Sequence, residues 1–294
     1  MIPPGPGRLR LAFLVLTLIW GSTWAVIRLG LEGIPPLTGV ALRFAIAGAV
    51  LLALVPRFGV RFRWTREELG LWAVNGLLSF TASYTIVYWA EQHIPSGLAA
   101  LLFATYPLFV AVIAHFALPG ERLGWRASGG ILLGFAGVAV IFSDDLQLLG
   151  GANVREVALV MLLSPIVSAV ATVAVKRWGA GIHPLSLTAV PMLLTAAVVG
   201  TLALALERGA TLVFDLRSVG SLLYLAVFGS AVTFTIYYWM LARARATQVA
   251  LIAYTIPIVA VAVGALLFQE PIRPRVVLGG VLVLMGVAIV TRRR

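Results

Sequence analysis

Residues 84–89 read YTIVYW, and 150 positions later residues 234–239 read FTIYYW. Four of the six residues are identical, and the two changes replace Tyr84 by Phe234 and Val87 by Tyr237. Such a pair has two explanations: chance in a biased composition, or a chain made of two copies of one unit. The rest of the sequence decides between them.

The composition is that of a polytopic membrane protein. Hydrophobic residues make up 61% of the 294 positions and charged residues 11%, whereas about a quarter of a soluble domain is charged. A net charge of +11 would suggest nucleic acid as the partner of a soluble chain, but basic cytoplasmic loops explain it better in a membrane protein. We therefore expect contact with a lipid bilayer and not with nucleic acid. The chain has no cysteine, which excludes disulfides and thiol chemistry.

Ten apolar stretches are long enough to cross a bilayer, which takes about 20 residues per helix. Charge clusters and Pro/Gly turns separate them, and the short connections leave no room for a soluble domain. The predicted fold class is an all-α polytopic membrane protein with ten transmembrane helices. These are expected at residues 10–30, 36–55, 68–90, 95–118, 124–142, 153–177, 184–206, 217–240, 246–268 and 274–291.

Basic residues are distributed unevenly over the two sides of this arrangement. With the N-terminus inside, 15 of the 22 Lys and Arg residues fall on the cytoplasmic side, and seven fall outside or in the outer half of a span. Basic residues concentrate in cytoplasmic loops. This asymmetry predicts that both termini are cytoplasmic.

The order of features in the first half of the chain is repeated in the second half. At an offset of 150, residues 105–107 (TYP) fall on residues 255–257 (TIP). At offsets of 148 to 150 the further matches are Gly129-Gly130 with Gly279-Gly280, Glu121 with Glu270, Gly137 with Gly286, Arg28 with Lys176, and Pro36 with Pro184. Chance is a poor explanation for all of them together, so the chain is interpreted as a duplication.

The duplication predicts two repeats of five helices each, at residues 1–148 and 149–294. Because five is odd, the second repeat enters the membrane from the opposite side, which produces an inverted repeat with a pseudo-two-fold axis in the membrane plane. Two arrangements of such halves expose one central site to opposite sides of the membrane. The expected transport mechanism is therefore alternating access.

Three stretches resemble the EamA-type family of the drug/metabolite transporter superfamily. Residues 18–52 (LIWGSTWAVIRLGLEGIPPLTGVALRFAIAGAVLL) resemble the first two helices of that family. Residues 102–141 and 252–290 resemble a later helix pair, each with a glutamate at a helix end followed by a glycine-rich helix. The resemblance covers nearly the whole chain.

Members of that family are ten-helix secondary transporters, commonly exporters of amino acids and related metabolites across the bacterial inner membrane. The resemblance implies the same function and location here, with a small-molecule substrate. Trp20-Gly21 fall on Ser168-Ala169, and Arg43 falls on Pro191. The central site should therefore be asymmetric.

Small hydroxyl and aromatic residues near the middle of the spans are the candidate substrate-binding groups, because such sites lie near the membrane midplane. The expected set is Trp20, Ser79, Ser83, Tyr84, Ser168, Thr233, Tyr237 and Tyr254. The alternative for each is packing between helices. Helices five and ten carry mostly small and aliphatic residues, so they are expected at the periphery. The lining suits a zwitterion with an apolar or aromatic side chain.

Arg43 lies seven residues after Pro36, roughly 10 Å along a helix. At that depth an arginine is costly unless paired, so we expect it to bind a substrate carboxylate or to pair with Glu32 or Glu91 as an outer gate. Snorkelling to the interface is the alternative. Pro107 and Pro257 are the predicted helix kinks.

Two further sets of residues have structural interpretations. Glu121 and Glu270 are expected to form ion pairs with nearby arginines. For the paired segments of the opening, interfacial anchoring by Tyr88, Trp89, Tyr238 and Trp239 is the alternative to substrate contact.

Enzyme signatures are missing. His93, His115 and His183 are scattered without metal-ligand spacing, so neither a catalytic site, a metal site nor a cofactor is expected. The alternatives left open are an uptake or exchange carrier for another small organic solute, a passive channel and, less favoured, a membrane enzyme. A monomer and a homodimer are both compatible with the sequence.

Overall fold

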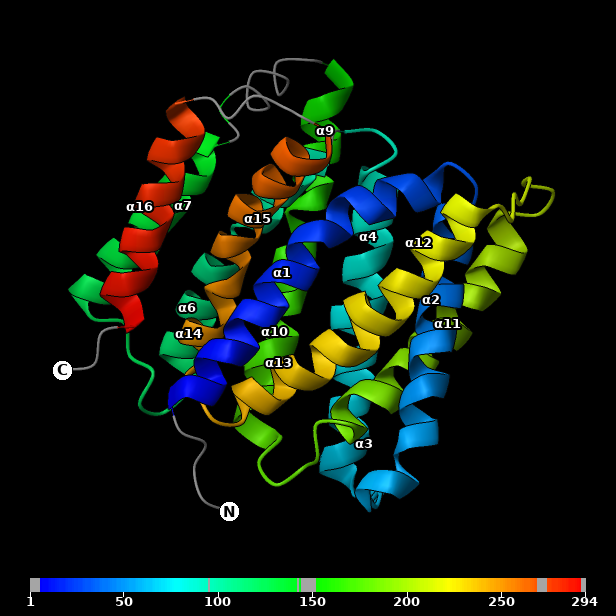
Figure 1. Ribbon diagram of the computed structural model, residues 1–294. Coiled ribbons are helices and arrows are strands. Elements are labelled where there is room, and N and C mark those ends of the chain that lie inside the picture. Colours follow the sequence, from blue (N-terminus) through cyan, green and yellow to red (C-terminus); the bar gives the residue numbers. More distant parts are fainter. Residues whose placement is uncertain (1–5, 95, 142, 144–151, 269–273, 292–294) are drawn as a thin grey trace.

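The computed structural model describes residues 6–94, 96–141, 143, 152–268 and 274–291. All elements assigned within these residues are helices (Figure 1), so the predicted all-α class is confirmed. The first part of the chain forms α1 (Pro6–Leu31), α2 (Pro36–Leu54), η1 (Pro56–Phe58), α3 (Arg66–Val74), η2 (Asn75–Ala82), α4 (Ser83–Ala90), α5 (Ser96–Phe103), α6 (Tyr106–Ala117) and α7 (Trp125–Ile141). The second part forms α9 (Ala152–Met161), α10 (Leu163–Trp178), α11 (Ser186–Leu206), α12 (Leu216–Ala226), η4 (Val227–Val232), α13 (Thr233–Leu241), α14 (Ala246–Ala250), α15 (Ile252–Phe268) and α16 (Pro274–Thr291).

Several of these elements continue one another, so that the described residues form ten helical stretches at the predicted places. Six stretches have the length and hydropathy to cross a membrane: Gly7–Leu31, Pro36–Leu54, Leu98–Ala117, Val154–Trp178, Ser186–Leu206 and Leu216–Leu241. Trp125–Ile141, Ala246–Val259 and Val277–Thr291 are apolar but shorter. The predicted boundary between residues 1–148 and 149–294 lies outside the described residues.

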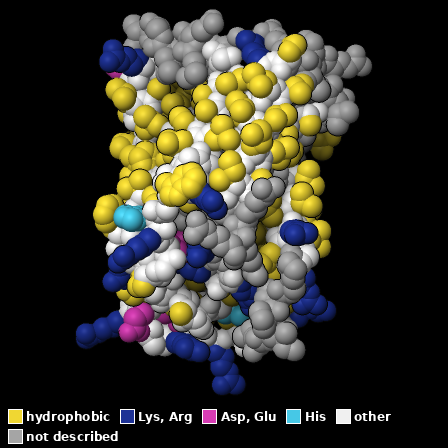
Figure 2. Space-filling view, turned by 90° about the vertical axis from the view of Figure 1, so that its left-hand side faces the viewer, with side chains coloured by type: hydrophobic (Ala, Val, Ile, Leu, Met, Phe, Trp, Pro, Cys, Tyr) yellow, Lys and Arg dark blue, Asp and Glu magenta, His cyan; other side chains and the backbone are white. Residues whose placement is uncertain are grey.

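The helices lie side by side in one bundle. The described start of α1 and the described end of α16 lie at the same, lower face in Figure 1, as an even number of crossings requires. On the flank that carries α7 and α16, hydrophobic side chains cover a broad band, and Lys and Arg side chains gather mainly toward the lower end (Figure 2). A bilayer would surround such a band.

Helices from the two halves of the chain interleave. The most extensive helix contacts join α2 to α11 and α7 to α16. Helix α1 packs on α12, α13 and α15, whereas α10 packs on η2, α4 and α6. One helix of each half, α1 and α10, thus packs against several helices of the other half. This arrangement is consistent with two related repeats.

Helices α7 and α16 meet through glycine. A Cβ atom on Gly137 would lie 2.6 Å from the carbonyl oxygen of Gly279, and one on Gly286 would lie 2.5 Å from that of Gly130. Only glycine permits this backbone approach, which van der Waals packing favours between membrane helices. The pair lies at one flank of the bundle (Figure 1), which agrees with the peripheral position expected for helices five and ten.

Two glutamates bind the amino ends of helices in the opposite half: Glu121, which is buried, and Glu207, which is partly buried. The carboxylate of Glu207 accepts hydrogen bonds from the amides of Leu37 and Thr38 at 2.8 Å each, at the start of α2. Glu121 accepts from the amides of Ala246 (2.7 Å) and Thr247 (3.1 Å), at the start of α14. The expectation that Glu121 pairs with arginines is therefore wrong. The free amide groups at a helix start, together with the positive end of the helix dipole, attract a carboxylate as an arginine side chain would.

Glu270, which was assigned the same role as Glu121, lies outside the described residues.

The two predicted kink prolines have different surroundings. The helical stretch around Pro107 is divided into α5 and α6 at Ala104–Thr105, just before the proline. Pro257 lies inside α15, and the division of that stretch falls earlier, at Leu251. The prolines are matched in sequence, but only Pro107 lies next to the point at which its helical stretch is divided.

Candidate functional site

A cavity of about 90 Å³ lies between the two halves of the bundle. It is large enough for several water molecules, since one needs roughly 10–15 Å³. The residues that line it are Trp20, Thr23, Trp24, Ile27, Arg43, Ser79, Ser83, Tyr84, Val87, Phe103, Tyr106, Ser168, Thr172, Phe234, Tyr237, Val249, Ala250, Ile252, Ala253 and Ile256. Within the described residues, α7, α11 and α16 contribute nothing to this lining.

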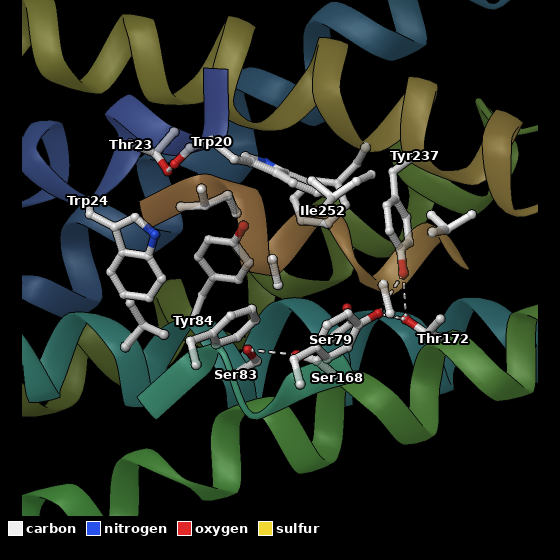
Figure 3. Close-up of a pocket in the computed structure, with 18 of the residues that line it drawn as sticks. Trp20, Thr23, Trp24, Ser79, Ser83, Tyr84, Ser168, Thr172, Tyr237 and Ile252 are labelled. Atoms are coloured by element: carbon white, nitrogen blue, oxygen red, sulfur yellow. Dashed lines mark hydrogen bonds between the residues drawn. The ribbon is translucent and has the colours of Figure 1, made fainter. Parts of the chain in front are cut away.

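Aromatic rings form one wall of the cavity. The Trp20 ring lies 5.3 Å from that of Phe234 and 5.6 Å from that of Tyr237, in edge-on and tilted arrangements. Trp24 meets Phe103 edge-on at 5.8 Å. Such edge contacts hold aromatic faces in fixed directions. Figure 3 shows Trp20 and Tyr237 on one side of the cavity and Tyr84 on the other.

Serine hydroxyls lie where α4 and α10 face each other. Ser168 donates to Ser83 at 2.9 Å (Figure 3), and the Ser83 and Ser164 hydroxyls lie 2.8 Å apart. Ser79, one turn before Ser83, belongs to the π-helix η2. Ser79, Ser83 and Ser168 all line the cavity.

A second hydroxyl cluster closes the cavity beside Tyr237. The hydroxyls of Tyr106 and Tyr237 lie 2.5 Å apart, and both contact Thr172 Oγ1, at 2.7 Å and 3.2 Å. These residues come from α6, α10 and α13. The cluster therefore ties a helix of the first half to two helices of the second.

Arg43 lines the cavity with its side chain 1% exposed. Its Nε donates to Ser230 Oγ at 2.8 Å, Nη2 to the Gly229 carbonyl at 3.0 Å and Nη1 to the Tyr88 hydroxyl at 3.3 Å. The guanidinium also lies 4.7 Å from the centre of the Tyr84 ring. These contacts offset part of the cost of burying the charge.

Two expectations for Arg43 are thereby corrected. The side chain does not snorkel to the interface, because its hydrogen bonds hold it inside the bundle. Its hydrogen-bond partners in the described structure are not Glu32 or Glu91. A guanidinium has five N–H donors, so donors remain for a ligand in the cavity.

The structure gathers most of the predicted substrate-binding residues around this cavity: Trp20, Ser79, Ser83, Tyr84, Ser168 and Tyr237, together with Arg43. Thr233 and Tyr254 are not among the lining residues. The Tyr254 hydroxyl donates to the Ile131 carbonyl at 3.0 Å, because its ring fills the space that Gly134 leaves on α7. Thr233 is fully buried.

Thirteen residues of the lining are absent from the predicted set, and four of these thirteen carry a hydroxyl or an indole N–H group. Thr23 and Trp24 lie three and four positions after Trp20, and Thr172 lies four after Ser168. Helical spacing could have added these three, since residues three and four apart share a face. Tyr106 is the first residue of α6 and directly follows the interruption at Ala104–Thr105.

The two halves also share an unusual backbone feature. The π-helices η2 and η4 occupy residues 75–82 and 227–232, and the second range corresponds to 77–82 at the offset of 150. A π-turn widens the helix locally and is frequent at functional sites. Here η2 carries Ser79 and η4 carries the Gly229 carbonyl that binds Arg43.

Tyr88 and Tyr238 of the opening segments are buried rather than interfacial. Tyr88 accepts from Arg43, and the Tyr238 hydroxyl donates to Asn75 Oδ1 at 2.6 Å. Interfacial anchoring is therefore wrong for these two residues.

In the described part of the chain, no group of three or more His, Asp or Glu side chains is placed to hold a metal ion.

Comparison with known proteins identifies relatives over the whole chain. The model of the EamA-like transporter family matches twice, at residues 9–143 and 156–292. An uncharacterized transporter of Archaeoglobus fulgidus is 29% identical over 278 residues, covering 94% of this chain and 95% of that protein. The uncharacterized inner membrane transporter YedA of Escherichia coli K12 is 31% identical over 258 residues, covering 86% and 80%.

Two further comparisons bear on function and fold. A probable terminal-alkyne amino-acid exporter of Streptantibioticus cattleyicolor is 30% identical over 282 residues, covering 95% of this chain and 92% of that protein. A solved crystal structure superposes with a TM-score of 0.80 at 21% identity, covering 97% of this chain and 96% of the other. At this low sequence identity the superposition shows that the fold is shared and nothing about function.

Proposed function

The chain belongs to the EamA-like transporter family, and we propose that it exports amino acids or related small metabolites across the cell inner membrane by alternating access. The observation that carries this proposal is the cavity between the two halves, with Arg43 as its cation. The relative named as a probable amino-acid exporter supports the choice of substrate class.

Arg43 supplies the selectivity for a carboxylate. Its guanidinium is held from three sides by Ser230, Gly229 and Tyr88, so its remaining donors have a fixed direction. A planar guanidinium binds a carboxylate through two parallel hydrogen bonds, and these are stronger than hydrogen bonds between neutral groups.

The other walls suit the remaining parts of an amino acid. The linked hydroxyls of Ser83 and Ser168 can accept hydrogen bonds from an ammonium group. Trp20 and Phe234 offer an apolar surface for a side chain. We therefore favour a zwitterion with an apolar or aromatic side chain as the substrate.

Alternating access would use the two repeats, residues 1–148 and 149–294, as the moving parts. In an inverted repeat the central site is exposed to opposite sides by rocking one half against the other. The Tyr106–Thr172–Tyr237 cluster joins the halves at one end of the cavity and would break when that end opens. Both termini would be cytoplasmic, in agreement with the uneven distribution of basic residues.

Counterflow in proteoliposomes tests the proposal. Vesicles loaded with unlabelled L-phenylalanine should accumulate external radiolabelled L-phenylalanine transiently, and Arg43→Ala should abolish this. A passive channel gives no acceleration by trans-substrate, and an enzyme would alter the labelled compound, which chromatography detects. Efflux from preloaded cells that express the protein separates an exporter from an uptake carrier. No counterflow with any of the standard amino acids would contradict the proposal.

A further inference from the structure

Glu91 is a buried carboxyl group just beyond the end of the cavity. It follows the last residue of α4, and its side chain is 0% exposed. Its amide donates to the carbonyl of Val87 at 2.9 Å, and Val87 lines the cavity. Glu91 therefore lies one helical turn from the cavity wall.

Only one oxygen of the carboxyl group has a hydrogen-bond partner among the described residues. Oε2 accepts a hydrogen bond from the Ser96 hydroxyl at 2.9 Å, but Oε1 is buried and has no partner in the part of the chain that the structure describes. The hydrogen bond from Arg28 Nη1 goes to the backbone carbonyl of Glu91 and not to its carboxyl group. A buried ionised carboxylate with an unpaired oxygen is costly, and protonation removes most of that cost.

The fold does not require a carboxyl group at this position. At the offset of 150, Leu241 takes the place of Glu91 at the end of α13, and it is 1% exposed. Lys176 Nζ donates to the Leu241 carbonyl at 2.8 Å, as Arg28 does to that of Glu91. The same cation-to-carbonyl contact thus forms with an apolar side chain.

The charged and titratable groups around Glu91 come from several helices. Arg28 on α1 and Arg43 on α2 act on it as positive charges, and Tyr88 precedes it by one turn on α4. Helix α9, which also packs on α4, carries Arg155 and Glu156, both exposed.

The other elements packed on α4 add no charge near Glu91. Helix η2 contains no titratable residue, and the cations of α10, Lys176 and Arg177, lie in its last turn, where they bind carbonyls of Leu241 and Ala117. His93 is exposed and contacts the Trp89 carbonyl.

Desolvation outweighs the positive charges. Burial raises the pKa of the Glu91 carboxyl from its ordinary 4.5 to about 8, against the opposing effects of the Ser96 hydrogen bond and of Arg28 and Arg43. The position of Glu91 at the negative end of the α4 dipole acts in the same direction as burial. The group therefore exchanges its proton in the physiological pH range.

We propose that Glu91 is a proton-binding site of the transporter and that its protonation is linked to the binding of a carboxylate at Arg43. The step is the addition of one proton to the carboxylate, which gives a neutral carboxylic acid, and the reverse step returns the proton. This inference rests on the proposed function only for the identity of the carboxylate ligand.

The direction of the linkage follows from the shared charge of Arg43. With the cavity empty, Arg43 favours the ionised form of Glu91. A carboxylate bound to Arg43 cancels part of that effect, so the proton affinity of Glu91 rises when the ligand binds. Because linkage is reciprocal, protonation of Glu91 strengthens carboxylate binding. A shift of one pKa unit on binding changes the affinity by about tenfold.

Infrared titration of the ligand-free protein tests the proton site independently of any substrate. Wild-type protein in lipid vesicles should show the carbonyl stretch of a protonated carboxyl group that disappears with a midpoint at about pH 8. Glu91→Gln and Glu91→Leu should lack this band, and Glu32→Gln, which changes an exposed carboxylate, should retain it. The absence of such a band from the wild-type protein overturns the proposal without recourse to a variant.

Phenylalanine binding tests the linkage. In weak buffer near pH 8, binding to the wild-type protein should take up protons, detected by a pH-sensitive dye, and the affinity should fall about tenfold as Glu91 ionises. Glu91→Gln should bind without proton uptake and with little dependence on pH. Equal pH dependence in wild type and Glu91→Gln overturns the linkage. If counterflow is absent but the infrared band is present and lost in Glu91→Gln, the proposed function fails and the proton site stands.

Discussion

Arg43 on α2 donates a hydrogen bond from Nη2 to the carbonyl oxygen of Gly229, 3.0 Å away in the π-helix η4. The Trp20 indole approaches the same oxygen at 3.4 Å. The contact fixes Arg43, which lines the cavity, against the second half of the chain. It therefore makes the geometry of the cavity depend on how the two halves are placed.

Removing the Arg43 side chain should abolish transport. Arg43→Ala is expected to lower counterflow of L-phenylalanine at least about tenfold, since a hydrogen bond to a charged group contributes roughly 1.5–3 kcal/mol. Arg43→Lys should restore only part of the activity, because an ammonium lacks the planar fork. Arg208→Ala, which removes an exposed arginine, serves as the control. Size-exclusion profiles should match the wild type, and normal transport by Arg43→Ala would show that this residue has no role in binding.

Cysteines in the cavity should be protected by substrate. The chain has no cysteine of its own, so Ser83→Cys, Ser168→Cys and Thr172→Cys each provide a single thiol at the lining. We expect a small water-soluble thiol reagent to modify them more slowly when L-phenylalanine is bound. Val138→Cys and Val287→Cys, on α7 and α16, should be insensitive to substrate.

Thr233→Cys is a further control in the same experiment, because Thr233 is buried but does not line the cavity. It should behave like the α7 and α16 controls. Protection of all of these positions alike would place the binding site elsewhere.

The segment between α2 and α3 should face the cytoplasm. Arg61→Cys lies in that exposed segment, and Arg208→Cys lies after α11 on the opposite side according to the predicted topology. In intact cells a membrane-impermeant maleimide should label Arg208→Cys at once and Arg61→Cys only after permeabilisation. The reverse labelling pattern would show that the protein has the opposite orientation in the membrane.

The α7–α16 contact should be sensitive to a single methyl group. In Gly137→Ala the new Cβ would lie 2.6 Å from the Gly279 carbonyl oxygen, so the helices must separate, at a cost of about 1–3 kcal/mol. Gly129→Ala, on the same helix, has no atom within 4 Å of the added Cβ and should be neutral or slightly stabilising. Thermal unfolding in detergent measures both, and equal midpoints would contradict the close contact.

Stability should depend on pH through Glu91. The folded-state pKa is raised from 4.5 to about 8, so the folded state holds this proton over a range in which the unfolded state has lost it. The stabilisation is fully present below pH 4.5 and is lost as the pH rises to about 8. The unfolding midpoint of the wild type relative to Glu91→Gln should therefore fall across this window. A constant difference would indicate that Glu91 keeps its ordinary pKa.

Much of the fold was predictable because it depends on local patterns. The helical stretches follow from runs of apolar residues, since each span must satisfy its own backbone hydrogen bonds in a membrane. The matched segments at 84–89 and 234–239 indicated the duplication. The depth of Arg43 within its helix marked it for a site because a buried charge needs partners.

The sequence by itself determined which residues share a helix face, and the tertiary structure decided which faces meet. Ser79, Ser83 and Ser168 were found from position alone, but Tyr254 turns to the Ile131 carbonyl because Gly134 leaves room there. The role of Glu91 likewise depends on tertiary structure, since its burial and its unpaired oxygen arise from the packing of several helices. A helical period fixes angles along one axis, whereas the rotation of each helix about that axis is set by the packing of all its neighbours.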